Sequence, residues 1–487
     1  MMLDSNQIPH RGILKSQVIG LILGPLFLLM TLVFPAPAEM GVQAWFALGL
    51  MLLMATWWST EAIPIPATAL LPILLIPALD LGSIRDATTP YANPIIFLFL
   101  GGFTLGLAMQ RWNLHRRIAL LTLRAVGDQP RRQIAGFMLA TAFLSMWVSN
   151  TATSIMMLPI GLSVIAMREQ ADSDGSRRYA TALLLAIAYS ASIGGIATLI
   201  GTPPNALLAA YLAENQGVDV GFAQWMLLGV PVSLIMLGLT WWWLSRGDFG
   251  VSNQGDGGEL VRNELEKLGS LHRAEKLVAM VFVLAAAGWI CRPLLSSGPM
   301  PWLSDTGIAI AAAVVLFLLP VDFGRRVFVL DWDTAEKLPW GILLLFGGGL
   351  ALAGVISSSG LAEWIAQSLS GYGTLPTLAM IALVTTIIIF LTEVTSNTAT
   401  AAAFLPLLGA MAMSQGAPVL LFTVPAAIAA SCAFMMPVAT PPNAIVFSSG
   451  QMAIKDMIRA GFLLNLFGIV VVTLFSYLFL GTIFSMG

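Results

Sequence analysis

Long apolar stretches recur along almost the whole chain, and they constrain its fold more than any other feature. A helix that crosses a hydrocarbon core of about 30 Å needs roughly 20 mostly apolar residues. The windows that reach or approach this length are Ile19–Phe34, Trp45–Trp58, Phe137–Ile165, Ala182–Ile200, Trp225–Trp243, Leu277–Ile290, Ile308–Leu319, Leu378–Leu391 and Phe462–Leu480. With the shorter segments among them, we expect about ten or eleven membrane crossings.

The composition excludes several classes of protein. Hydrophobic residues make up 57% of the 487 residues and charged residues only 10%, so the chain lacks the charged surface of a soluble enzyme. The formal net charge is −2, and the Lys and Arg residues lie between apolar blocks, which argues against a nucleic-acid partner. Cys291 and Cys432 lie far apart and the histidines lack metal-ligand spacing, so we expect neither a disulfide nor a transition-metal site.

The ends of the apolar stretches indicate how the chain is oriented. The run that starts at Ile19 continues into further membrane segments without a convincing cleavage site, so we expect a retained first helix and not a signal peptide. Positive charge in short loops marks the cytoplasmic side. By this rule the cytoplasmic side holds the N-terminal Lys and Arg residues with Arg111, Arg116, Arg117, Arg124, Arg131 and Arg132. These features predict a multi-pass protein of the cytoplasmic membrane.

A polar stretch at 246–276 divides the chain into two halves, 1–245 and 277–487, that share three motifs. In chain order these are an apolar segment with a Gly pair (101–102 and 347–348), Ser-Asn-Thr-Ala-Thr (149–153 and 396–400) and Thr-Pro-Pro-Asn-Ala (202–206 and 440–444). The common order and nearly common spacing predict two structural repeats joined by a linker.

The repeats are expected to run in opposite directions through the membrane. Four predicted crossings, at roughly 180–200, 225–243, 277–292 and 306–320, separate the two Ser-Asn-Thr motifs. The Gly-rich segment after Trp340 adds an even number, whether it re-enters the membrane or spans it twice. An even number of crossings makes the motif-bearing helices antiparallel, and inverted repeats typically place a substrate at their interface.

The Ser-Asn-Thr motif has the chemistry of a binding site. Ser, Asn and Thr compete with helical backbone hydrogen bonds and so favour a broken helix, which is tolerated at membrane depth only beside protein or a water-filled cavity. Freed N–H groups and side-chain donors suit a carboxylate, and freed carbonyls suit a sodium ion. The alternative is that these residues only form hydrogen bonds between helices, but recurrence in both halves favours a site.

Three further features have open interpretations. The Pro-Pro pairs in Thr-Pro-Pro-Asn predict a second helix break in each half. The Gly pairs are either re-entrant hairpins or places of close helix contact. Glu61 and Glu393 are ionisable residues next to apolar sequence, and each is either a proton-linked carboxylate or a helix cap at the membrane interface.

In combination these motifs resemble those of the divalent anion/sodium symporters, which include di- and tricarboxylate carriers. The resemblance covers nearly the whole chain and includes 60–66 (Thr-Glu-Ala-Ile-Pro-Ile-Pro) with both copies of the other two motifs. It implies an all-α polytopic protein of a bacterial inner membrane, with about 11 transmembrane helices plus two re-entrant hairpins that have the Ser-Asn-Thr motifs at their tips. It also implies a homodimer, in which each protomer has a scaffold domain and a transport domain that moves like an elevator. The implied function is sodium-coupled symport of C4-dicarboxylates of the succinate, fumarate and malate class.

The resemblance also implies site residues. The substrate would contact Ser149, Asn150, Thr151, Ser396, Asn397, Thr398, Thr440 and Pro441. One sodium ion would bind to Ser145, Ser149, Asn150 and the backbone at Gly201, and a second to Thr392, Thr395, Asn397 and the backbone at Ala439. Hydroxyls at Ser145 and Thr392, each four residues before its motif's serine, agree with this assignment.

Other functions remain as alternatives. They are a dicarboxylate exchanger, a sodium symporter for citrate or sulfate, and a channel lined by the same broken helices. An intramembrane enzyme would need a base close to Ser149 or Ser396, and neither motif contains a histidine. We therefore expect a transporter and not an enzyme, with sodium as its only cofactor.

Overall fold

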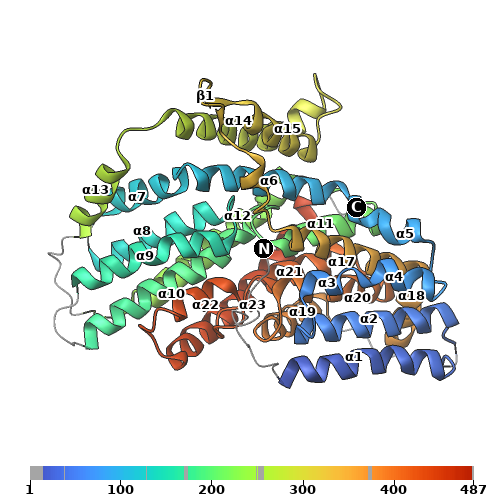
Figure 1. Ribbon diagram of the computed structural model, residues 1–487. Coiled ribbons are helices and arrows are strands. Elements are labelled where there is room, and N and C mark those ends of the chain that lie inside the picture. Colours follow the sequence, from blue (N-terminus) through green and yellow to red (C-terminus); the bar gives the residue numbers. More distant parts are fainter. Residues whose placement is uncertain are drawn as a thin grey trace, which may run out of the picture.

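The protein is described from a computed structural model, shown in Figure 1. The structure describes residues 15–37, 39–127, 129–168, 174–247, 249, 257–370 and 376–484. The stretch before Lys15 and the middle of the predicted linker, residues 250–256, lie outside the described residues. Almost all of the described chain is helical, as the apolar stretches predict.

The first half of the chain forms helices of very different length. In order they are α1 (Lys15–Val33), α2 (Val42–Thr60), α3 (Ile65–Thr68), α4 (Leu71–Ala78), α5 (Ile84–Thr88), the 3₁₀ helix η2 (Thr89–Ala92), α6 (Pro94–Arg111), α7 (Leu114–Val126), α8 (Pro130–Ser145), α9 (Asn150–Arg168), α10 (Asp174–Ile196), α11 (Pro203–Gln216) and α12 (Phe222–Leu244).

The second half follows a short helix, α13 (Gly257–Leu268), so the predicted linker is partly helical. Its elements are α14 (Arg273–Ser296), α15 (Asp305–Leu318), β1 (Pro320–Asp322), β2 (Val327–Phe328), α16 (Trp332–Ala335), α17 (Trp340–Ser358), α18 (Leu361–Ser370), α19 (Thr377–Thr392), α20 (Asn397–Ser414), α21 (Leu420–Ala430), α22 (Pro441–Phe447) and α23 (Ile454–Ile483). The two short strands pair antiparallel, with Pro320 opposite Phe328.

Within the described residues, nine helical stretches are long and apolar enough to span a bilayer. They are α1, α2, Ile84–Arg111, α9, α10, α12, α14, α17 and α23. Four shorter apolar stretches are Ile65–Ala78, α15, α19 and α21. The number of crossings depends on how these shorter stretches lie in the membrane, so about 11 stays a prediction.

The helices differ widely in burial, which identifies the centre of the molecule. Figure 1 shows the pair α1 and α2 at one edge and the pair α14 and α15 at the opposite edge. The most apolar windows of α1 and α14 are only 17% and 22% buried, whereas that of α10 is 94% buried. The peripheral helices therefore leave wide apolar surfaces for lipid or another chain, and α10 passes through the core.

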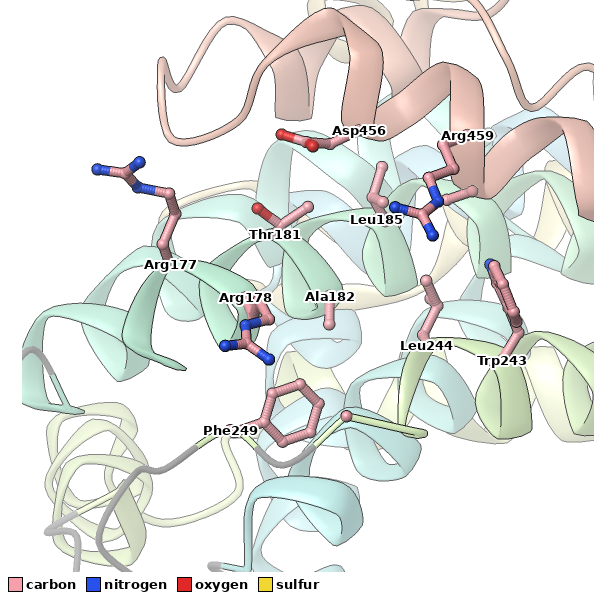
Figure 2. Close-up of a pocket in the computed structure, with 12 residues that line it drawn as sticks. Arg177, Arg178, Thr181, Ala182, Leu185, Trp243, Leu244, Phe249, Asp456 and Arg459 are labelled. Carbon is pink, nitrogen blue, oxygen red and sulfur yellow. The ribbon is translucent and has the colours of Figure 1, made fainter. Parts of the chain in front are cut away.

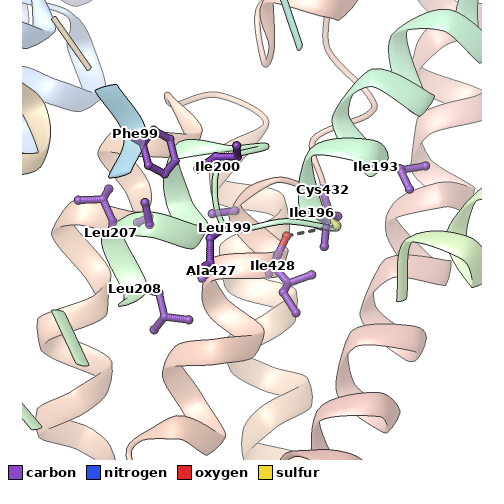
Figure 3. Close-up of a cluster of buried hydrophobic side chains, with 14 of the residues drawn as sticks. Phe99, Ile193, Ile196, Leu199, Ile200, Leu207, Leu208, Ala427, Ile428 and Cys432 are labelled. Carbon is purple, nitrogen blue, oxygen red and sulfur yellow. Dashed lines mark hydrogen bonds between the residues drawn. The ribbon is translucent and has the colours of Figure 1, made fainter. Parts of the chain in front are cut away.

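One part of the hydrophobic core lies where the broken helices of the two halves meet. Figure 3 shows Phe99 of α6 and Leu207 of α11 in one cluster with Ile196 of α10 and Ile428 of α21. The thiol of Cys432 donates a hydrogen bond to Ile428 O at 3.4 Å in the same cluster. Large apolar side chains thus surround both helix breaks.

Of the two interpretations open for the Gly pairs, the structure supports close helix contact, because both pairs lie inside continuous helices. Gly101 lies inside the continuous helix α6 and Gly348 inside α17. A Cβ on Gly101 would lie 2.6 Å from the Ala309 backbone of α15, and one on Gly348 would lie 2.4 Å from Ala69 O. Without side chains at these glycines, the helix can approach neighbouring backbone. The chain turns back at the Ser-Asn-Thr motifs, where α8 contacts α9 and α19 contacts α20, and these are the positions that the resemblance implies for the hairpin tips.

Two other glycines let long helices approach the broken segments closely. A Cβ on Gly229 of α12 would lie 2.6 Å from Ile196 O, and one on Gly461 of α23 would lie 2.2 Å from Phe434 O. The two glycines therefore play the same part in the two halves. Each allows a long helix to lie directly against a carbonyl beside a helix break.

A methyl group added at Gly461 is expected to destabilise the fold. Gly461→Ala places Cβ against the Phe434 carbonyl, and overpacking of a buried site costs about 1–3 kcal/mol. The midpoint of thermal unfolding of the purified protein in detergent should therefore fall. Gly481→Ala is the matched control, because the space around Gly481 in the same helix is open. An unchanged midpoint for Gly461→Ala would show that α23 can move away from the loop without cost.

Candidate functional site

Each Ser-Asn-Thr motif lies at the start of a helix that follows a sharp break. Helix α8 ends at Ser145 and α9 begins at Asn150, while α19 ends at Thr392 and α20 begins at Asn397. The first N–H groups of α9 and α20 have no partner within their own helices. The motif side chains Ser149, Asn150, Thr151, Ser396, Asn397 and Thr398 are all half-buried. Each motif therefore presents hydroxyl and amide groups beside the positive end of a helix.

The Thr-Pro-Pro-Asn elements start helices in the same way in both halves. Thr202 and Thr440 are extended N-cap residues, and the two prolines that follow occupy the first helical positions, where no N–H is needed. The Thr440 hydroxyl accepts a hydrogen bond from Asn443 N at 3.3 Å. Thr440 is buried and Pro441 is exposed.

The asparagine of each element holds the broken backbone in place. Asn205 Nδ2 donates to Gly195 O at 3.1 Å, Ile196 O at 3.3 Å and Thr198 O at 2.8 Å. Asn443 Nδ2 donates to Ala433 O at 3.1 Å and Met436 O at 3.0 Å. Both asparagines are fully buried. Their amides satisfy carbonyl groups that the helix breaks leave without partners.

Three of the four residues predicted for the first sodium site, Ser145, Asn150 and Gly201, lie close together. The Ser145 hydroxyl donates to Ala191 O at 2.6 Å and is in hydrogen-bond contact with the Asn150 amide. When the amide nitrogen of Asn150 faces the neighbouring carbonyl groups, it donates to Ala191 O at 3.1 Å and to Gly201 O at 3.3 Å. When the amide is turned over, its oxygen lies beside the Ala191 and Gly201 carbonyl oxygens and the Ser145 hydroxyl. The structure thus brings Ser145, Asn150 and Gly201 together in a group of oxygen atoms that fits a hard cation.

The Ser149 hydroxyl has a different role in this structure. It accepts a hydrogen bond from Ala152 N at 3.2 Å and so caps the first turn of α9. To serve as a ligand it would have to share or release this bond.

The second predicted sodium site has the same core. The Thr392 hydroxyl donates to Asn397 Oδ1 at 2.7 Å and to Ala430 O at 3.0 Å, which matches the contacts of Ser145. Thr395 is turned elsewhere, since its hydroxyl donates to Leu391 O at 2.8 Å and lies 2.6 Å from Thr400 Oγ1. Ala439 is buried in the loop before α22. Thr392 and Asn397 are therefore joined directly, whereas Thr395 is hydrogen-bonded to other groups.

The two halves cross over at the centre of the protein. Helix α9 of the first half packs against α22 of the second, and α20 of the second packs against α11 of the first. The Ser431 hydroxyl donates to Thr202 Oγ1 at 3.4 Å, and both residues are buried. Each Ser-Asn-Thr helix thus lies beside the Thr-Pro-Pro-Asn helix of the opposite half, so all four elements surround one region.

The Glu393 carboxyl group is held by several hydrogen bonds in the second half. Its carboxylate is only 3% exposed and accepts hydrogen bonds from the backbone N–H groups of Phe434, Met435 and Met436 at 2.8–3.0 Å. Asn465 Nδ2 of α23 donates to it at 2.7 Å. Glu393 therefore ties α19 to the loop before α22, and it is not a helix cap at the membrane interface.

Sequence reasoning missed this arrangement because Asn465 and the loop are far from Glu393 in the chain. The available signal was the position of Glu393 directly after Thr392, where the first half has Met146 after Ser145. Glu61, by contrast, is exposed at the end of α2 in a left-handed conformation. Its position agrees with a helix-end role.

Comparison with known sequences gives a match over almost the whole chain. Residues 15–486 match the family described as the sodium:sulfate symporter transmembrane region. The sodium-dependent dicarboxylate transporter SdcS of Staphylococcus saprophyticus is 42% identical over 490 residues, which cover 98% of this chain and 94% of the relative. The protein of the same name from Staphylococcus aureus strain USA300 is 42% identical over 474 residues, covering 95% of this chain and 91% of the relative.

Solved structures give a more distant match in fold. The YdaH transporter of Alcanivorax borkumensis superposes with a TM-score of 0.57 at 13% identity, covering 96% of this chain and 98% of that one. MtrF of Neisseria gonorrhoeae superposes with a TM-score of 0.59 at 14% identity, covering 98% and 96%. At this identity the likeness supports a shared helical membrane fold and nothing finer.

Replacement of Glu393 by Gln is expected to loosen the loop before α22. The amide keeps the shape of the side chain but removes the charge, and hydrogen bonds to a charged group contribute about 1.5–3 kcal/mol against about 1 kcal/mol for neutral ones. The Gln side chain can also turn an N–H₂ group toward the backbone donors. The midpoint of thermal unfolding should therefore fall.

Glu61→Gln is the control, because Glu61 is exposed and the same change of charge there should leave the midpoint unaltered. Equal midpoints for the two variants would show that the carboxylate of Glu393 does not hold the loop.

Proposed function

Because the chain belongs to the sodium:sulfate symporter family, we propose that it carries dicarboxylates of the succinate, fumarate and malate class together with sodium ions. It is a multi-pass membrane protein, and the two SdcS relatives are sodium-dependent dicarboxylate transporters. The protein acts by transport and not by chemical conversion of its substrate.

One observation carries this function most directly. Both halves bring a helix start with Ser, Asn and Thr to the same central region, next to a cluster of hydroxyl, amide and carbonyl oxygens. Two donor-rich helix starts suit the two carboxylates of one substrate. Two oxygen clusters suit two cations, which would offset the two substrate charges.

Each substrate carboxylate would bind to one motif. Ser149, Asn150 and Thr151 would donate to one carboxylate, and Ser396, Asn397 and Thr398 to the other. Thr440 and Pro441 would border the same region, where the exposed ring of Pro441 provides an apolar wall. The half-buried state of the motif side chains leaves them accessible to a small anion.

The sodium ions would use the oxygen clusters behind the motifs. Ser145, Ser149, Asn150 and the Gly201 carbonyl would form the first site, in which cation binding selects the orientation of Asn150 with its oxygen inward. Thr392, Thr395, Asn397 and the Ala439 carbonyl would form the second. Ser149 would have to share or release its hydrogen bond from Ala152 N, and Thr395 would have to turn away from Thr400.

Electrostatics would couple the two substrates. A dianion without partners is costly to move into a low-dielectric interior, so sodium binding must precede or accompany substrate binding. Glu393 places a carboxyl group directly after Thr392, and its oxygens favour a cation at the second site. The cation-loaded site then accepts the dicarboxylate, and the inward sodium gradient drives uptake.

The movement would be of the elevator type, in a homodimer. Helices that carry the site would slide against a scaffold, and the scaffold would form the dimer contact. The wide exposed apolar surfaces of the peripheral helices supply room for such a contact.

Light scattering of the purified protein in detergent should give a protein mass of twice the 51.9 kDa chain. A mass of one chain at every protein concentration would contradict the dimer.

The central test is uptake of radiolabelled succinate into proteoliposomes. An inward sodium gradient should drive accumulation, and replacement of sodium by choline should abolish it. Unlabelled citrate and sulfate, added as competitors, rank the anions. Uptake that occurs only against preloaded dicarboxylate would identify an exchanger, and stronger competition by sulfate than by unlabelled succinate would contradict the proposed substrate class.

Variants in the same assay separate the two kinds of site. Ser145→Ala and Thr392→Ala should raise the sodium concentration needed for half-maximal uptake, and Thr398→Ala should mainly raise the KM for succinate. A lost hydrogen bond of about 1–2 kcal/mol corresponds to roughly a fivefold to thirtyfold change. Ser414→Ala in the last turn of α20 is the control, since its hydroxyl bonds only to its own helix at Met411 O. Unchanged sodium dependence in both alanine variants would place the cations elsewhere.

A further inference from the structure

The helix breaks of the two halves differ in how far they are covered, although the repeated motifs relate them residue by residue. In the first half, Trp147 before the Ser-Asn-Thr motif is 8% exposed, and Ile200 before the Thr-Pro-Pro-Asn element is 5% exposed. The residues at the same motif positions in the second half, Val394 and Val438, are 66% and 78% exposed. The first pair of breaks is therefore covered, and the second pair is open.

Aromatic rings hold Trp147, which lies at the tip of the first hairpin (α8 and α9). Its ring stacks on Phe222 at the start of α12 with 6.1 Å between centroids, and Phe222 stacks on Trp289 of α14 at 4.6 Å. Phe282 of α14 meets Trp147 edge to face at 5.0 Å. The Asp305 carboxylate accepts a hydrogen bond from Phe222 N at 2.8 Å, and Asp305 O accepts one from Trp289 Nε1 at 3.0 Å. The tip of the first hairpin is thus docked on α14.

Ile200 is covered by α6. A Cβ on Gly102 of this helix would lie 3.0 Å from Ile200 Cδ1. The motif residue that corresponds to Gly102 in the second half is Gly348 of α17, and a Cβ there would meet Ala69 of the first half instead. Helix α6 therefore packs on the first break, whereas its counterpart α17 leaves Val438 exposed.

The two ends of α12 indicate on which side of the membrane this contact lies. Figure 2 shows the end of α12, with Trp243 and Leu244, beside the starts of α10 and α23. Trp241 Nε1 of α12 donates to Arg131 O at 3.0 Å, and the distribution of positive charge predicts that Arg131 is cytoplasmic. Because α12 is long enough to span a bilayer, its start at Phe222 lies toward the opposite surface.

Helix α14 gives the same level for the tip of the first hairpin. The buried ion pair of Arg117 and Glu275 joins α7 to the start of α14 at the predicted cytoplasmic side, whereas Trp289 lies in the last third of this helix. The tip therefore lies against the non-cytoplasmic part of α14. With inverted repeats, the second hairpin (α19 and α20) enters from the non-cytoplasmic side, and the exposed Val394 lies at its tip.

We propose that this conformation opens the binding site to the non-cytoplasmic side, and that Trp147 is the positioning residue that holds it there. The inference rests on the proposed transport function. When the helices that carry the site move toward the cytoplasm, Trp147 leaves α14, Ile200 leaves α6, and Val438 packs against α17.

The asymmetry of the two hairpin tips gives this contact a direction. Val394 stands where the first half has Trp147, so the opposite conformation has no aromatic ring at the matching position. Aromatic pairs contribute beyond the burial of their area. The protein without substrate therefore rests with its site open to the side from which sodium and dicarboxylate arrive. Trp147 sets this balance without touching the substrate.

The test is the rate of labelling of single cysteines by a membrane-impermeant maleimide. The background is the full chain with Cys291→Ser and Cys432→Ser, which removes both native cysteines. In spheroplasts, Val438→Cys should be labelled several-fold faster than Ile200→Cys, its counterpart in the first half. Faster labelling of Val438→Cys in inside-out vesicles than in spheroplasts would overturn the proposal. Slow labelling from both sides would also overturn it, because Val438 would then face lipid or another chain.

Replacement of the ring tests the role of Trp147. In the Val438→Cys protein, Trp147→Ala should lower the ratio of external to internal labelling roughly twofold to tenfold, as expected for the loss of one aromatic contact. Trp147→Phe should largely restore the ratio. Phe479→Ala is the control, since it removes a ring contact with Phe475 inside α23. A merely structural defect would raise labelling from both sides together, and this result or an unchanged ratio would overturn the role of Trp147.

Labelling and uptake fail separately. The labelling rates are measured without transport, so a wild type that accumulates no succinate would contradict the proposed function and leave the labelling result unaffected. Sodium-driven uptake together with labelling of Val438→Cys from the cytoplasmic side alone would keep the function and overturn the assigned conformation.

Discussion

A helix that is broken inside a membrane exposes backbone groups that lipid cannot hydrogen-bond, and this constraint governs the centre of the protein. Two helices are broken in each half, and buried side-chain amides satisfy part of the freed backbone. Asn205 and Asn443 each donate to carbonyls on both sides of a turn. The remaining free N–H and carbonyl groups lie where they can bind an anion and cations. The same breaks therefore create a structural cost and the proposed binding site.

Close packing around the breaks makes this arrangement rigid. Gly229 and Gly461 allow α12 and α23 to lie against the broken segments, and large apolar side chains fill the surrounding space (Figure 3). Because each Ser-Asn-Thr helix contacts the Thr-Pro-Pro-Asn helix of the opposite half, movement of one half would disturb both oxygen clusters. A site built in this way is well suited to move as one body.

The two halves are similar but not equivalent. In the first half, the Thr198 hydroxyl donates to the backbone of Met146 at 2.6 Å. In the second half, the Glu393 carboxylate occupies the matching position and accepts from the backbone of Met436 at 3.0 Å. In the first half the segment after α10 supplies the side chain and the segment after α8 the backbone, whereas in the second half the segment after α19 supplies the side chain and the segment after α21 the backbone. The second half alone has a carboxyl group in this contact. This asymmetry gives the two proposed sodium sites different electrostatic surroundings.

The sequence by itself determined the class of the protein and predicted the repeated halves and the polar residues of the candidate site. Helix length, hydrophobicity and the local preferences of Ser, Asn, Thr and Pro act over a few residues, so they can be read from the chain. Only the tertiary structure decided that the Gly pairs are helix contacts, that the Thr392 hydroxyl points to Asn397 while that of Thr395 does not, and that Glu393 is bound by Asn465. These outcomes depend on the rotation and register of helices packed against one another, which residues far apart in the chain set together.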